Sequence, residues 1–255
     1  MQDLDSFVAI GDSFTEGMDD PGPDGIFMGW ADRLAAMISA QNSGFRYANL
    51  AIRGKTLHEI VEEQLPLATS LKPQLVAFCG GGNDILTPGT DPDALAEIYE
   101  IAVADLRAAG SEVIIFTGFD TKTTPLLRSL RGKIAIYNTH LWSVADRYHC
   151  HVVDLWAMSI LHDPRAWSED RLHLSPEGHH RVALRTAEVL GYKTEEAWDT
   201  PWPPSEGSDW MTQRRRDLKW AREHVMPWVG RLVRGESTGD GLAPKRPELL
   251  PVSAD

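Results

Sequence analysis

The chain has 255 residues, of which 42% are hydrophobic and 24% charged, and its formal net charge is -12. This length suits one substantial core plus an appendage, and the composition is that of a globular protein rather than a disordered, collagen-like or disulfide-rich one. The acidic balance excludes a large nucleic-acid interface, because neutralising phosphates requires clustered Lys and Arg.

Nothing in the sequence predicts export or a membrane span. Residues 1–6 carry no basic flank, and no apolar stretch ending at a small-residue cleavage site follows them. No run of about 20 apolar residues is present. Cys79 and Cys150 are too few for a disulfide framework and lack metal-ligand spacing. We therefore expect a cytoplasmic protein with reduced cysteines and no stable membrane insertion.

Short apolar runs alternate with helical patterns along the first 195 residues, which is typical of parallel strands joined by crossover helices. Strands are predicted at residues 7–10, 46–50, 75–79, 113–116 and 151–154. Helices are predicted at residues 30–40, 92–109, 127–148 and 176–190. The order predicts an α/β fold, a three-layer α/β/α sandwich with a five-stranded parallel sheet of the flavodoxin-like kind.

The composition changes beyond residue 194. Prolines and tryptophans gather in residues 198–204, which cannot form a regular helix, and a further helix is predicted over residues 209–234. We expect a core domain at residues 1–195, a linker and helical extension at 196–235, and a flexible tail at 236–255. The tryptophans of the extension need a core of their own, which we favour, or a partner subunit, which would make the protein a homo-oligomer.

Ser13 stands in a Gly-Asp-Ser segment directly after the first predicted strand. It is expected at the carboxyl end of the sheet, where open α/β folds bind their ligands. Gly11 and Gly17 permit a tight turn there. A serine at such a turn either caps the next helix or acts as a nucleophile, and this segment alone does not choose between them.

Asp170 and His173 lie three residues apart in the loop before the last predicted helix. A serine hydroxyl becomes an effective nucleophile when a base accepts its proton, and the base needs a partner that fixes its tautomer. His173 fits the base and Asp170 the partner. Taken alone, the pair is also compatible with a loop salt bridge or a helix cap.

Gly54 and Asn83 follow the second and third predicted strands. A glycine N–H and an asparagine amide can both donate to a developing oxyanion, although both residues are also common in turns. Turn formation does not explain four segments that each lie at a strand end or in the final loop. Together they supply a nucleophile, two donors, a base and an orienting acid.

In this order the four segments resemble the blocks of the SGNH, or GDSL-type, hydrolase family, over about residues 6–191. The resemblance implies Ser13 as nucleophile, His173 as general base and then acid, and Asp170 as its orienter. It also implies an oxyanion hole made of the Ser13 N–H, the Gly54 N–H and the Asn83 side chain.

The family resemblance implies no cofactor and no metal. The sequence departs from it at Ala51, where many relatives carry another glycine, and this leaves the donor role of Gly54 intact. Asp84 is expected to hold the turn that aims Asn83. Several histidines lie in the C-terminal half of the core without ligand spacing, namely His149, His151, His162, His179 and His180. The last two are expected to have surface or packing roles.

The predicted function is hydrolysis of a carboxylic ester or thioester of a small-molecule acyl substrate through an acyl-enzyme. One alternative is an acyltransferase, in which the tryptophan-rich extension excludes water and a sugar or other hydroxyl accepts the acyl group. Another is a non-catalytic binding module on the same fold. Phe27, Met28 and Trp30 follow the nucleophile, where they either line the substrate pocket or pack the first helix.

Overall fold

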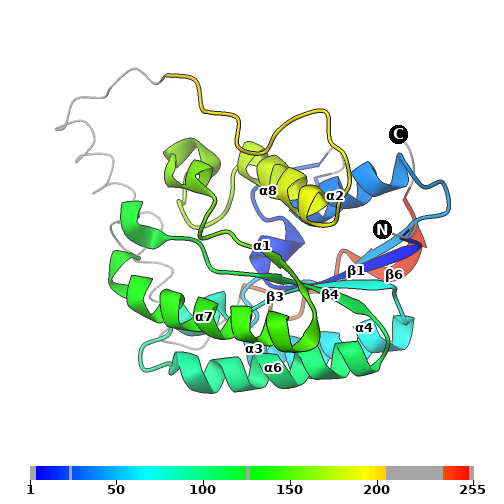
Figure 1. Cartoon of the computed structure of the whole chain (residues 1–255), viewed down its shortest axis with the longest axis horizontal. Coiled ribbons are helices and arrows are strands. Elements are labelled where there is room, and N and C mark those ends of the chain that lie inside the picture. Colours follow the sequence, from blue (N-terminus) through cyan, green and yellow to red (C-terminus); the bar gives the residue numbers. More distant parts are fainter. Residues whose placement is uncertain (1–3, 23–24, 125–126, 205–237, 253–255) are drawn as a thin grey trace.

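The computed structural model describes residues 4–22, 25–124, 127–204 and 238–252 (Figure 1). In this part of the chain a six-stranded sheet with the order β5-β4-β3-β1-β2-β6 lies between two layers of helices. Its strands are β1 Ser6–Gly11, β2 Arg46–Asn49, β3 Leu75–Cys79, β4 Glu112–Phe116, β5 His151–Val153 and β6 Arg246–Pro251. The first five strands are parallel, which confirms the predicted α/β sandwich.

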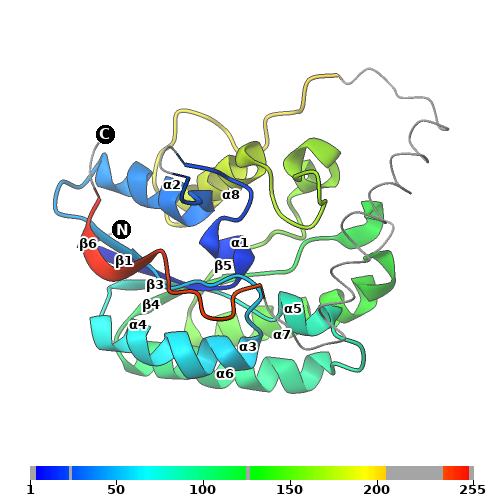
Figure 2. The same cartoon turned by 180° about the vertical axis from the view of Figure 1, so that it is seen from behind.

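Helices α2 and α8 cover one face of the sheet, and α3, α4, α6 and α7 cover the other (Figures 1 and 2). The helices are α1 Ser13–Glu16, α2 Gly29–Ser39, α3 Leu57–Glu59, α4 Leu65–Leu71, α5 Gly82–Leu86, α6 Pro92–Ala108, α7 Arg131–Tyr148 and α8 Pro176–Val189. A π-helical turn at Ile60–Gln64 joins α3 to α4, and four 3₁₀ turns are found at Thr121–Thr123, Arg128–Leu130, Ser159–His162 and Pro164–Ala166. No helix in the described ranges is long and apolar enough to cross a bilayer.

The central strand β1 shows why both faces are covered. Successive side chains of a strand point to opposite faces. Phe7 and Ala9 join the core beneath α2 and α8, whereas Val8 and Ile10 join the core above α6 and α7. All four are fully buried. The continuous apolar run is therefore that of a strand buried on both sides.

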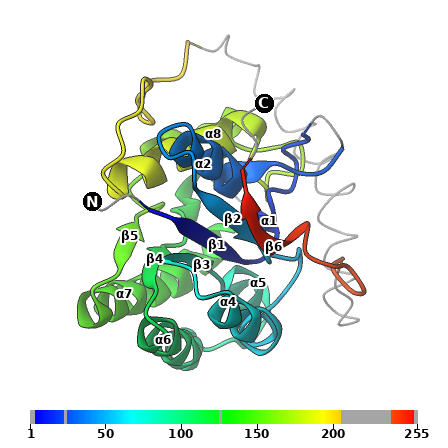
Figure 3. The same ribbon diagram turned by 90° about the vertical axis from the view of Figure 1, so that its right-hand side faces the viewer.

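The sixth strand corrects the sequence-based expectation. Residues 246–251 lie in the segment predicted as a flexible tail, yet they form β6, which pairs antiparallel with β2 at the edge of the sheet (Figure 3). The side chains of β6 are mostly exposed, so no alternation of apolar and polar residues announces the strand. Its backbone pairing and the hydrogen bonds from Arg246 to the carbonyl oxygens of Tyr47, Leu250 and Pro251 hold it in place.

The predicted helix at residues 209–234 lies outside the described residues, and the expected oligomer contact through the extension stays a prediction. Two tryptophans that precede it are described, and they pack against the core beneath α8 instead of a core of their own. The Arg185 guanidinium lies 5.1 Å from the ring centre of Trp198, and that of Arg181 lies 4.1 Å from that of Trp202. The remaining division into residues 1–195 and 196–235 stays a prediction.

Candidate active site

Ser13 is the first residue of α1, which follows β1 without a loop. Asp12 caps this helix, because its Oδ1 accepts the amide N–H two residues later at 3.1 Å. The Gln64 side chain donates to the carbonyl oxygen of Gly11 at 2.9 Å and accepts its N–H at 2.8 Å. A Cβ on Gly11 would lie 2.5 Å from the Cys79 carbonyl oxygen, so only glycine fits. These contacts fix Ser13 at the carboxyl end of a central strand.

His173 lies in the loop before α8, and its ring connects Ser13 with Asp170. Its Nε2 is 3.1 Å from Ser13 Oγ, and its Nδ1 is 2.5 Å from Asp170 Oδ2. The other carboxylate oxygen of Asp170 accepts the N–H groups of Leu172 at 2.8 Å and of His173 at 3.0 Å. Because a carboxylate accepts, we assign the proton to Nδ1, which leaves Nε2 free to accept from the serine hydroxyl.

The charges around His173 favour its protonated form. Burial opposes a positive charge on the ring, but the hydrogen bond and charge of Asp170, together with Asp19 and Asp12, raise the pKa of His173 above its ordinary value. Burial likewise opposes ionisation of Asp170, but His173 lowers the pKa of that carboxyl well below its usual range. Burial also raises the pKa of the Asp12 carboxyl to about 6. Asp170 therefore stays ionised and stabilises an imidazolium.

Asp19 is a third carboxylate at this site, and the sequence analysis missed it. The Ser168 hydroxyl lies 2.6 Å from Asp19 Oδ2 and 2.7 Å from Asp170 Oδ1, and it has one proton to share between them. Asp19 Oδ2 is also 3.9 Å from His173 Nδ1. Among the described side chains, Asp19, Asp170 and His173 form one group with metal-ligating atoms close together. The 2.5 Å separation within it is that of a direct hydrogen bond, since two ligands of one metal ion lie about 3 Å apart.

Asn83 lies in α5, just after β3, and faces the same space as Ser13 and His173. Its Nδ2 donates to the Lys55 carbonyl oxygen at 2.9 Å and lies 3.3 Å from Asp12 Oδ2. The amide is thus tied to the loop that follows β2, in which Gly54 has a φ of 77°. That value suits glycine, since other residues are strained there.

Asp84 makes a structural contact beside Asn83. Its Oδ2 accepts the N–H of Leu57 at 2.8 Å, so it connects α5 to the start of α3. The loop that contains Gly54 is therefore held against α5 at two points, the Lys55 carbonyl and the Leu57 N–H. Asn83 lines the cavity described next, whereas Gly54 is not among its lining residues.

A cavity of about 190 Å³ opens beside Ser13, Asn83 and His173. Its walls are mainly apolar and come from β4, the turns that follow it, α7 and the loop that carries His173. Its apolar lining residues include Phe116, Phe119, Leu127, Leu130, Ile134 and Trp167. Ser13, Asn83 and His173 also line it, so the proposed reacting groups open into a mainly apolar space.

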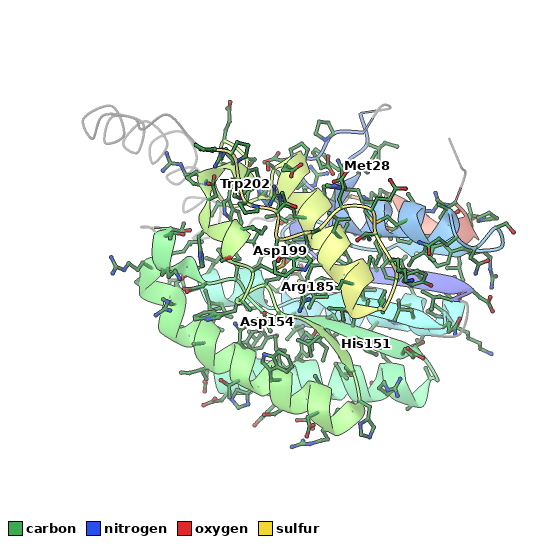
Figure 4. The ribbon with its side chains drawn as sticks, turned by 45° about the horizontal axis from the view of Figure 1, so that its top comes forward. Met28, His151, Asp154, Arg185, Asp199 and Trp202 are labelled. Carbon is green, nitrogen blue, oxygen red and sulfur yellow. The ribbon has the colours of Figure 1, made fainter. Side chains whose placement is uncertain are left out.

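The structure places Phe27, Met28 and Trp30 away from this cavity. Trp30 is fully buried, and its ring centre lies 4.4 Å from that of Phe116 in the core beneath α2. The Arg53 guanidinium lies 4.9 Å from the ring centre of Phe27, and Met28 precedes α2 (Figure 4). None of the three residues lines this cavity, and Trp30 packs from α2 into the core, so a role of these residues in substrate binding stays a prediction.

His179 has the packing role that was expected. It is completely buried in α8, where its Nδ1 accepts the N–H of Trp30 at 3.2 Å and its Nε2 lies 3.1 Å from the Met18 carbonyl oxygen. Burial lowers its pKa to about 4. The ring is therefore neutral and carries its proton on Nε2.

Comparison with known proteins identifies a family and a shared fold. A family model described as the GDSL-like lipase/acylhydrolase family matches residues 9–181. A search of curated protein sequences finds no match.

Solved structures show a similar fold. An acetylxylan esterase, Axe2 from Geobacillus stearothermophilus, has a TM-score of 0.63 and 20% identity, covering 74% of this chain and 95% of that one. TesA has a TM-score of 0.61 and 22% identity, covering 72% and 97%. The psychrotrophic esterase EstA from a Pseudoalteromonas species, inhibited by monoethylphosphonate, has a TM-score of 0.59 and 15% identity, covering 73% and 97%.

Proposed function

The chain belongs to the GDSL-like lipase/acylhydrolase family and is an esterase of the SGNH type, and on that basis we propose that it cleaves carboxylic esters through an acyl-enzyme formed on Ser13. The observation that carries the proposal is the continuous series of contacts from Ser13 Oγ through the His173 ring to Asp170. Because the chain belongs to an enzyme family, we favour catalysis over the alternative of a non-catalytic binding module.

In the proposed reaction, Ser13 Oγ attacks the acyl carbonyl carbon while His173 Nε2 takes the hydroxyl proton. The tetrahedral intermediate collapses as the ester C–O bond breaks, and His173 returns the proton to the departing alcohol. A water molecule then attacks the acyl-enzyme with the same base, which releases the acid and restores Ser13. Asp170 keeps the ring oriented and stabilises its positive charge throughout.

The oxyanion is proposed to bind the Ser13 N–H, the Gly54 N–H and the Asn83 amide. Asn83 supports this role best, because its Nδ2 donates at 2.9 Å to the Lys55 carbonyl, which fixes the amide plane. The longer 3.3 Å contact to Asp12 is the one that an oxyanion would replace. Gly54 follows from the family pattern, and its loop is held against α5 through the same Lys55 carbonyl.

The cavity supports an apolar acyl group. An apolar cavity of about 150 Å³ accommodates benzene, so about 190 Å³ accommodates roughly six to eight carbon atoms. Most of the described residues that line it are apolar. We therefore propose a medium-length acyl ester as the preferred substrate. An acetyl group would leave most of the cavity unfilled.

The experiment is a series of p-nitrophenyl esters from acetyl to palmitoyl, assayed with the parent enzyme and with Ser13→Ala. We expect the largest kcat/KM at hexanoyl or octanoyl and no turnover in the variant. Addition of glycerol or glucose as acceptor separates hydrolysis from acyl transfer. Acyl transfer is the alternative that rests on the tryptophan-rich extension, most of which lies outside the described residues. Undiminished turnover by Ser13→Ala would overturn the nucleophile assignment.

A pair of variants on α7 tests the acyl site. Ile134 is buried in the cavity wall, whereas Ile136 on the same helix is 47% exposed. Ile134→Trp should lower kcat/KM for octanoyl by about tenfold or more while leaving acetyl turnover nearly unchanged, because the added ring fills the space for the chain. Ile136→Trp is the matched control. An unchanged chain-length preference in Ile134→Trp would contradict the proposed acyl site.

A further inference from the structure

Lys245 lies just before β6, a strand that Figure 3 shows at the edge of the sheet. Its ammonium group contacts the end of α1 and the first turn of α2. Its Nζ donates to the carbonyl oxygens of Glu16 at 2.5 Å, Phe27 at 2.8 Å and Met28 at 2.8 Å, and it lies 2.6 Å from Asp32 Oδ2. A residue near the end of the chain thus joins segments that lie more than 200 positions earlier.

The first of these acceptors belongs to the helix of the proposed nucleophile. Glu16 is the last residue of α1, and Ser13 is the first. The Glu16 carboxylate also accepts the N–H of Arg53 at 2.7 Å and pairs with the Arg53 guanidinium. Since Arg53 precedes Gly54, one residue links the helix of Ser13 to the loop of the proposed oxyanion donor. Lys245 holds that residue by its carbonyl group.

The other acceptors lie at the far end of the loop that leaves α1. The two ends of this loop meet at Gly17 and Gly29, where a Cβ added to Gly29 would lie 2.4 Å from the Gly17 Cα. Backbone therefore touches backbone at the base of the loop, and no side chain fits between. Carbonyl groups from both ends converge with the Asp32 carboxylate on one buried point, and an ammonium ion is the group that satisfies all of them.

The C-terminal segment contacts the same region a second time. Gly239 is buried against the loop after β2, and a Cβ there would lie 2.1 Å from the Arg53 carbonyl oxygen. The segment therefore approaches the proposed oxyanion loop at Gly239 and the nucleophile helix at Lys245. Gly239 makes its contact through the backbone, whereas Lys245 uses a charged side chain. A single substitution can therefore remove the Lys245 contact.

We propose that Lys245 is a positioning residue for ester hydrolysis, which holds α1 and the ends of the adjoining loop so that Ser13 keeps its place relative to His173 and Gly54. The inference rests on the proposed role of Ser13. Lys245 is not among the residues that line the cavity. Its loss should therefore lower kcat and leave KM for a p-nitrophenyl ester nearly unchanged, because a displacement of about 1 Å at the reacting atoms costs on the order of 10²-fold in rate.

The first variant is Lys245→Met, for which we expect kcat to fall about 30- to 100-fold with KM changed less than twofold. Lys245→Arg keeps a charged donor and should recover part of kcat. The double variant Lys245→Met/Asp32→Asn separates positioning from stability. It removes the carboxylate left without its partner, so the thermal midpoint should rise towards that of the parent while kcat stays low, since the carbonyl groups remain unheld.

Lys133→Met is the matched control, because Lys133 Nζ also donates to a carbonyl oxygen, that of Thr90 at 2.8 Å, at a place apart from Ser13. Its kcat should stay within twofold of the parent. The proposal is overturned if Lys245→Met keeps kcat within twofold, or if the double variant regains kcat together with its thermal midpoint. Turnover by Ser13→Ala is a separate result that would overturn the proposed function itself, whatever Lys245 does.

Discussion

The two sides of the site are held in different ways. On the nucleophile side, the end of β1, the cap of α1 and the end of α1 are joined to distant parts of the chain through Gln64, Asn83 and Lys245. On the base side, the Asp170 carboxylate is contacted within its own loop by the Ser168 hydroxyl, by two backbone N–H groups and by His173 Nδ1. Ser13 is therefore placed by tertiary contacts, whereas His173 is placed mainly by local ones.

This difference separates stability from activity. Removing a contact on the nucleophile side leaves buried polar groups in several elements without partners, so we expect losses of both stability and activity. Removing charge on the base side disturbs one loop, so activity should fall much more than stability. Variants on the two sides test whether activity and stability respond differently.

The largest effect is expected for Asp170→Asn on the base side. The kcat should fall about 10⁴-fold, because an amide in place of the carboxylate favours the wrong tautomer of His173 and no longer stabilises the imidazolium. The free energy of unfolding should also fall, because the lowered pKa of Asp170 means that its charge stabilises the folded state. This loss should be smaller than the loss of activity, since the amide oxygen can still accept the backbone N–H groups of the loop. Steady-state kinetics and urea unfolding measure the two quantities.

Asp163→Asn is the control for this variant, because Asp163 also accepts an N–H within its own turn but lies outside the cavity lining. Its activity should match that of the parent. A loss of less than tenfold in Asp170→Asn would contradict the role of Asp170.

A smaller loss of activity, together with a loss of stability, is expected for Asn83→Ala on the nucleophile side. The kcat should fall about 10²- to 10³-fold through loss of an oxyanion donor. The free energy of unfolding should fall by about 1 to 3 kcal/mol, because the Lys55 carbonyl loses its donor. Asn42→Ala, which removes a hydrogen bond to the Leu4 carbonyl, should lower stability without lowering kcat. Equal kcat losses in the two variants would refute the donor role.

His179 lies in α8, which follows the loop of His173, and it contacts Met18 in the loop that follows α1. We expect its titration to change the stability of the protein and not its activity. Its pKa is lowered to about 4 in the folded state, whereas an unfolded histidine titrates near 6.5. Between these values the unfolded chain binds more protons, so stability should decrease as the pH falls from 6.5 to 4, by up to about 3 kcal/mol from this group. Urea unfolding at pH 7 and pH 4.5 measures the decrease. His179→Gln should make it smaller, and an unchanged pH dependence would argue against this role.

The smallest effect is expected for Asp19→Asn. Asp170, Asp19 and Asp12 are the charged groups that face His173, and each raises its pKa. Loss of the Asp19 charge should therefore lower the pKa of His173 and move the acidic limb of the kcat/KM profile to lower pH. Asp93→Asn, an exposed position on α6, should leave the limb in place. A shift to higher pH in Asp19→Asn would have the wrong sign.

Much of the catalytic arrangement could be predicted from the sequence, because its residues lie at the ends of apolar strands or in one short loop. The structure places the His173 ring within hydrogen-bonding distance of both Ser13 and Asp170. The strands expected at residues 75–79 and 113–116 lie within one residue of their observed bounds. Local sequence patterns were therefore sufficient to predict these strands and the residues at their ends.

The missed features depend on contacts between distant segments. Asp19 meets Ser168 across 149 positions, and Lys245 meets Glu16 across 229, without any period or spacing to signal either contact. Strand β6 was missed because its side chains are largely exposed. The sequence left open whether Phe27, Met28 and Trp30 line the pocket or pack the first helix. The cavity beside Ser13 is lined instead by residues that include Ile134 and Tyr137 of α7.

The most direct test of the acyl-enzyme is covalent trapping. The parent and His173→Ala are incubated with a p-nitrophenyl alkylphosphonate, and the modified peptide is located by mass spectrometry. We expect one phosphonyl group per chain on Ser13, formed at a much lower rate in His173→Ala. Modification of another residue, or of Ser13 at the same rate in both proteins, would contradict the assignment of nucleophile and base.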